Sequence, residues 1–197
     1  MMRYLQLICL VSFLCITEMS AQSLKVDNEI LRWEAGASAG LNNDGYQIDL
    51  SAAWFPLQYV GARMTLGFAG EIEEIGDWGN DDWDSADDYA IRIKLIPALV
   101  LRSPRLVNWK SQSGGFYLFA EPGFVLAPGA AGSRNARIFN VDLKTGINLQ
   151  LERVVLSLGY GITDFSLYSG RPINHHGLPD RDNYITHSVF IAAAYKF

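Results

Sequence analysis

The sequence has few of the residues on which most active sites and structural bridges depend. It contains two cysteines and three histidines in 197 residues. Both cysteines, Cys9 and Cys15, lie in an apolar run from Leu5 to Ile16, which follows Arg3 and precedes the stretch Met19-Ser20-Ala21. This pattern predicts a secretory signal peptide over residues 1–21. The exported chain, residues 22–197, is therefore expected to have no disulfide, and we predict a single domain.

Long apolar runs and clusters of basic residues are also missing after the first 21 residues. No later stretch reaches the roughly 18 uninterrupted apolar residues that a membrane-spanning helix needs. If the protein spans a membrane, it must do so with strands. The formal net charge of -5, without any basic cluster, argues against nucleic acid as a partner.

What the chain does have is alternation. From residue 29 onward, apolar residues alternate with polar or small residues at a period of two, which is typical of strands with two unlike faces. Pro97 and Pro122 fall inside two of these segments, where each forfeits one ladder hydrogen bond and predicts a bulge or a strand end. The eight alternating segments are residues 32–41, 46–54, 60–68, 91–101, 116–126, 139–149, 154–163 and 185–197.

Eight such segments predict an all-β fold, an eight-stranded antiparallel up-and-down barrel that spans a membrane. Most connections follow the pattern of transmembrane barrels, in which short periplasmic turns alternate with longer outer loops. The predicted turns are residues 55–58, 102–115 and 150–153, and the predicted longer outer loops are residues 71–88, 127–137 and 166–183. The turn 102–115 is longer than this pattern predicts, and the first outer loop, residues 42–45, is shorter.

Alternation alone leaves two alternatives for the direction of the apolar face. A secreted, lipocalin-like barrel would enclose it and bind an apolar ligand, whereas a transmembrane barrel would turn it toward lipid. The polar face carries charges of both signs near the middle of its strands, and such charges can pair inside a narrow lumen. We predict that a lumen charge network is formed by Arg32, Glu34, Asp49, Arg63, Arg92, Lys94, Glu121, Asp142 and Lys144.

The last segment carries a family resemblance. It ends in Tyr195-Lys196-Phe197, with apolar residues at alternate positions and aromatic residues near the ends of the apolar faces. The whole exported chain resembles the small outer-membrane β-barrel proteins, the OmpA-barrel and OmpX-like group of the porin family. The resemblance implies the outer membrane of a Gram-negative bacterium, with Tyr195 and Phe197 as the signal that the barrel assembly machinery reads.

Few residues of the sequence are candidates for catalysis or metal binding. His187 and Ser188 are adjacent on a predicted strand and so face opposite ways, which disfavours the His and Ser pairing of outer-membrane lipid hydrolases. The pair His175-His176 lies in a predicted loop, where it makes a weak metal site. The segment Glu71 to Asp88 is rich in carboxylates and has no basic residue, so it could collect divalent cations or remain a solvated loop.

These observations predict a non-enzymatic outer-membrane barrel without a cofactor or a resident metal. Its expected role is structural or surface-interacting, with outer-membrane lipid and lipopolysaccharide as partners and an external ligand that no residue pattern names. Eight strands enclose a lumen that side chains just fill, so a general diffusion pore is not expected. The alternatives are the lipocalin-like carrier and, third, a lipid hydrolase.

Overall fold

The computed structural model describes residues 31–43, 45–71, 91–108, 114–128, 137–167 and 185–197. The predicted signal peptide, the acidic segment beyond Glu71 and the pair His175-His176 lie outside the described residues. In the part of the chain that is described, no helix is long and apolar enough to cross a membrane.

The described residues fold almost entirely into antiparallel strands. Their bounds are β1 Trp33–Asn42, β2 Gly45–Trp54, β3 Val60–Glu71, β4 Ile91–Arg102, β5 Val107–Asn108, β6 Gly114–Leu126, β7 Phe139–Leu151, β8 Val154–Thr163 and β9 Thr186–Lys196.

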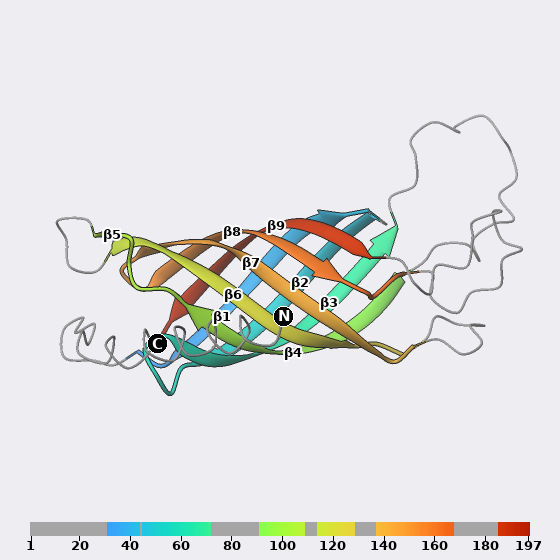
Figure 1. Ribbon diagram of the computed structural model, residues 1–197, viewed down its shortest axis with the longest axis horizontal. Helices are drawn as coiled ribbons and strands as arrows, with labels where there is room; N and C mark the ends of the chain where they lie inside the picture. The colour runs from blue at the N-terminus through green and yellow to red at the C-terminus, as the bar shows by residue number, and fades with distance from the viewer. Residues whose placement is uncertain (1–30, 44, 72–90, 109–113, 129–136, 168–184) are drawn as a thin grey trace, which may run out of the picture. The chain divides into compact units, whose positions relative to one another are not determined.

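The strands form one closed sheet. Each long strand pairs with its neighbour along the chain, β1 pairs with β9, and β4 pairs with β6, which closes the circle. Figure 1 shows the long strands running obliquely around a common axis, and they number eight. The predicted eight-stranded up-and-down barrel is confirmed. The two-residue β5, which pairs with the start of β6, was not predicted, because it lies in a segment assigned to a turn.

The apolar face of each strand points away from the barrel axis. In β7, for example, Val141, Leu143 and Ile147 are exposed while Asp142 and Lys144 between them are buried. The same alternation holds along the other long strands, whose exposed side chains are mostly Leu, Ile, Val, Ala and aromatic residues. The wall is therefore apolar outside and polar inside, as expected for strands that face lipid.

The two ends of the barrel differ in their connections. We call the end that carries Trp33 and Phe197 the terminal end, where the backbones of these two residues exchange hydrogen bonds of 3.1 and 3.0 Å. The short connections between β2 and β3 and between β7 and β8 lie at this end. Strands β3, β6 and β8 end, and β4, β7 and β9 begin, at the opposite end, called here the loop end.

Pro97 and Pro122 lie within β4 and β6, and both strands continue through them. The pairing of β4 with β3 and that of β6 with β7 continue without a break, since Pro97 is opposite Met64 of β3 and Pro122 is opposite Leu143 of β7. The predicted bulge or strand end is therefore absent. The missing N–H groups of the two prolines affect a different strand pairing.

The affected pairing is the one between β4 and β6, called here the β4–β6 seam. Ser103 N donates to Leu118 O across the seam at 2.9 Å. In an antiparallel ladder, alternate residues of a strand bond to the same neighbour. The odd-numbered residues of β4 and the even-numbered residues of β6 therefore direct their backbone N–H and C=O groups at each other across the seam. Pro97 and Pro122 belong to these two sets. Proline has no backbone N–H, so two successive hydrogen-bonded residue pairs of the seam each lack one hydrogen-bond donor.

We expect the double substitution Pro97→Val and Pro122→Val to restore these two bonds. If each adds about 1 kcal/mol, backbone hydrogen exchange in residues 95–101 and 120–126 should slow by roughly thirtyfold. Exchange followed by mass spectrometry on detergent-solubilised protein measures this, with β1 and β2 as the internal control. Equal slowing of all strands, or none in the seam, contradicts the assignment of the seam as the weak pairing.

Candidate functional site: the lumen of the barrel

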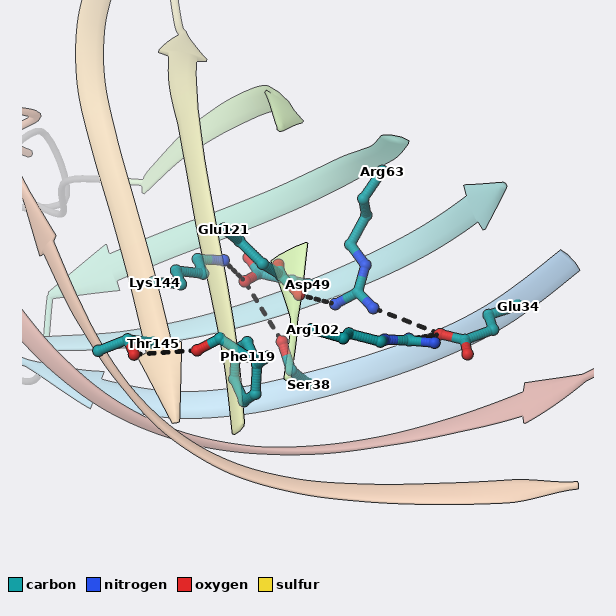
Figure 2. Close-up of polar contacts among 9 residues, drawn as sticks. All are labelled: Glu34, Ser38, Asp49, Arg63, Arg102, Phe119, Glu121, Lys144 and Thr145. Carbon is teal, nitrogen blue, oxygen red and sulfur yellow. Dashed lines mark hydrogen bonds and ion pairs between the residues drawn. The ribbon is translucent and has the colours of Figure 1, made fainter. Parts of the chain in front are cut away.

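Glu34 is the centre of a charge cluster at the terminal end of the lumen. Its side chain is buried, and its carboxylate oxygens lie 2.5 Å from Arg102 Nη2, 3.5 Å from Lys196 Nζ and 3.6 Å from Arg63 Nη2. The three cations come from β4, β9 and β3. One carboxylate on β1 therefore contacts side chains from three other strands. Figure 2 shows two of these side chains, Arg63 and Arg102, beside it.

Arg63 also binds a second carboxylate. Its Nη1 lies 2.8 Å from Glu121 Oε1. Because Arg63 is on β3 and Glu121 is on β6, this ion pair spans β4 on the lumen side. It therefore joins the two strands that flank β4, next to the seam in which the prolines remove ladder donors.

Aromatic rings fill the lumen around this cluster. The Arg102 guanidinium carbon lies 3.7 Å from the centre of the Phe55 ring and 5.3 Å from that of Tyr117, and Lys196 Nζ lies 6.0 Å from the Tyr117 ring. A cation over an aromatic face is attracted by the ring quadrupole. Phe55 itself packs in a buried group with Ala53 and Val100.

A second group of charges occupies the middle of the lumen. Asp49 Oδ2 accepts hydrogen bonds from Lys144 Nζ at 3.0 Å and from Ser38 Oγ at 3.3 Å, as Figure 2 shows. Lys94 Nζ donates to Gln47 Oε1 at 3.0 Å. Asp49 is 1 % exposed, so these contacts replace the water that its charge loses on burial.

Two phenylalanines fill the remaining space in the middle of the lumen. The ring centres of Phe119 and Phe190 are 6.4 Å apart. Inward-facing glycines make room for them, since a Cβ on Gly159 would lie 2.3 Å from Phe190 Cζ and one on Gly146 would lie 2.9 Å from Phe119 Cε1. The two glycines thus give these rings space inside the barrel.

The loop end is filled by the segment that follows β8. Arg92 donates to the carbonyl oxygens of Ser166 and Pro128, both at 2.7 Å, and its guanidinium carbon lies 4.7 Å from the Phe165 ring centre. Thr186 Oγ1 donates to Phe165 O at 2.7 Å. A buried apolar group surrounds these contacts, formed by Ala69, Ile96, Val125, Ala127, Phe165 and Leu167.

The structure places eight of the nine predicted network residues on the inner face. Asp142 is buried among them, and its Oδ2 has no hydrogen-bond partner. Arg32 is the exception, because it precedes β1 and its side chain is exposed. It therefore lies outside the cluster.

The network also contains two cations that the predicted set omitted. Arg102 was assigned to a turn, although it keeps the same even spacing as Arg92 and Lys94 along β4. Lys196 was placed on the charge-bearing face, and the ion pair with Glu34 gives it a role there. On the inner face of the described long strands, six cations accompany four carboxylates, and the two terminal nitrogens of Arg92 donate to backbone carbonyls.

His187 and Ser188 do face opposite ways. His187 is exposed on the outside of β9, whereas Ser188 is buried and faces inward. They cannot act on one substrate as a base and its nucleophile. The described residues also contain no group of three or more metal-ligating side chains that could hold a metal ion.

No protein-family model matches the chain, and no curated protein matches it in sequence. Solved structures do resemble it. Neisserial surface protein A is 12 % identical with a TM-score of 0.51, and the match covers 85 % of this chain and 97 % of that one. Outer membrane protein H from P. aeruginosa is 14 % identical, with a TM-score of 0.47 and coverage of 84 % and 99 %. The outer membrane enzyme PagL is 12 % identical, with a TM-score of 0.47 and coverage of 83 % and 99 %.

The fold is that of a transmembrane β-barrel. More particularly, the chain has the architecture of the small eight-stranded outer-membrane barrels, as the resemblance of its closing strand predicted. At this level of identity the likeness concerns the fold, and activity has to be argued from the site.

We expect Arg63→Leu to destabilise the barrel by about 3 to 5 kcal/mol, because it leaves the buried Glu121 carboxylate without its partner. The matched control is Arg137→Leu. Arg137 pairs with Asp164 at 3.1 Å on the surface, and an exposed pair contributes at most about 1 kcal/mol. Urea unfolding of the two variants in detergent compares these effects, and equal losses would contradict a buried network.

Gly159→Ala should destabilise the barrel by about 1 to 3 kcal/mol, because the added Cβ overlaps the Phe190 ring. Adding Phe190→Leu should recover much of this loss by removing the ring atoms that clash. The double-mutant cycle is measured by the same unfolding experiment. A purely additive cycle would show that the two residues do not share the space.

Proposed function

We propose that the protein is an integral outer-membrane barrel of a Gram-negative bacterium, with a structural or surface-interaction role and no enzymatic activity. The observation that carries this proposal is the two-faced wall, apolar outside and charged inside. A closed barrel leaves no strand edge unpaired, which is what the interior of a membrane requires. The charged inner face does not support the lipocalin-like carrier, which would enclose apolar side chains.

Aromatic residues at both ends of the wall support the membrane location. Trp33 and Trp54 lie side by side at the terminal end with ring centres 6.3 Å apart, and Phe124 and Phe139 form a pair at 4.6 Å on the outer face of β6 and β7. Aromatic side chains gather at the interfaces between lipid and water. The expected partners are outer-membrane lipid and lipopolysaccharide.

Tyr195 and Phe197 suit the proposed assembly signal. They are 49 % and 56 % exposed on the outer face of the last strand, whereas Lys196 between them reaches inward to Glu34. The assembly machinery could read the two aromatic rings while the lysine remains available to the lumen.

The filled lumen disfavours a general diffusion pore. Phe55, Phe119, Phe190 and Phe165 follow one another from the terminal end to the loop end, and the charges between them bind each other. The role is therefore assigned to the surface of the barrel and the loops.

Fractionation of cells that express the chain tests this proposal. We expect the protein in the outer-membrane fraction, extracted only by detergent, with a gel mobility that changes on heating. Planar-bilayer recordings of the same material should show no porin-sized conductance steps. Recovery as a soluble periplasmic monomer would overturn the membrane assignment, and large stable steps would overturn the filled lumen.

A further inference from the structure

The outer face of the wall carries one polar pair that the lumen network does not explain. On the outward face of the described strands, His187 is the single side chain with a basic nitrogen. Its Nδ1 lies 2.6 Å from the hydroxyl oxygen of Tyr160, which is itself 41 % exposed. The two rings are tilted by 32° with centres 5.9 Å apart.

The pair sits at the loop end of the apolar band. His187 is opposite Ile162 on β8, and its carbonyl accepts a hydrogen bond from Asn43 N, just beyond the end of β1. Tyr160 lies two residue pairs further from the loop end, opposite Val189. Because the pair lies close to this end of the strands, we expect its polar atoms to reach the lipid headgroups.

The contact with Tyr160 determines which ring nitrogen of His187 can donate a hydrogen bond to a ligand. A phenol is a stronger acid than the N–H of a neutral imidazole, so the hydroxyl donates and Nδ1 accepts. The remaining imidazole hydrogen is then on Nε2, which becomes a donor directed away from Tyr160. In the protonated imidazole Nε2 keeps its hydrogen, so it remains a donor.

A cation lies on the same sector of the rim. Arg137, which precedes β7, is exposed and paired with Asp164, which follows β8. Asp164 in turn accepts a hydrogen bond from Val141 N at 2.5 Å, which fixes it against β7. The β7–β9 sector thus presents a guanidinium and an imidazole donor at the edge of the apolar band.

We propose that Tyr160 and His187 form a contact site for the phosphate group of an outer-leaflet glycolipid, with His187 Nε2 as the hydrogen-bond donor and Arg137 as the neighbouring cation. The inference rests on the proposed membrane location. Phosphate oxygens are the anionic acceptors of the headgroup layer, and hydrogen bonds to ionised groups are stronger than those between neutral groups.

Lipid retention tests the site. The full exported chain is placed in phosphatidylcholine nanodiscs that contain equal amounts of a phosphorylated glycolipid such as lipid A and of the same glycolipid without its phosphates, and the lipids that remain bound are counted by native mass spectrometry. His187→Leu should lower the ratio of phosphorylated to unphosphorylated glycolipid by about three- to tenfold, the effect of one hydrogen bond. His187→Gln, which keeps a donor, should retain part of the preference.

The control is Trp33→Phe, which changes an outward aromatic residue at the terminal end, and the heat-dependent gel shift verifies that each variant is folded. An unchanged ratio in folded His187→Leu, or an equal loss in Trp33→Phe, overturns the site. Nitrogen NMR of His187 separates lipid from free anion. A Nε2 shift produced by inorganic phosphate in pure phosphatidylcholine nanodiscs would overturn the lipid assignment. Failure to insert into nanodiscs at all would instead overturn the proposed function.

Discussion

The contacts of the Glu34 carboxylate determine how the lumen of this barrel is organised. A charge on the inner face of a narrow barrel has little water, so its partners have to come from other strands. Glu34 finds them on β3, β4 and β9, and Arg63 extends the set to Glu121 on β6. The polar interior therefore links β1 to β3 and to β4, and β3 to β6, which are pairs of strands that are not neighbours in the sheet, and it adds an ion pair between the neighbours β1 and β9.

The lumen holds aromatic rings as well as charges. Phe119 and Phe190 lie with ring centres 6.4 Å apart, and the inward glycines Gly146 and Gly159 give them space. The outer wall is then the surface on which function can differ between barrels of this size. The pair Tyr160 and His187 lies at the loop end of its apolar band and places a hydrogen-bonded polar contact on that surface.

Much of the fold could be predicted from the sequence, because a period of two is a local signal that each strand carries independently. The inward charges follow from the same period once the apolar face is assigned to lipid. Partners could not be predicted. Glu34 and Arg102 are 68 positions apart, and Lys144 and Asp49 are 95 apart, so only the closed circle of strands brings them together. The Tyr160 and His187 contact depends likewise on the β8–β9 register, and β5 was too short to show any period.

The position of the Glu34 and Lys196 pair has a consequence for the order of assembly. Glu34 is on the first strand and Lys196 is on the last, and these two strands form the pairing that completes the circle. A chain in which β9 has not yet reached β1 keeps an open edge and also lacks one of the cations around Glu34. Sealing the wall and completing the set of cations around Glu34 are therefore a single event.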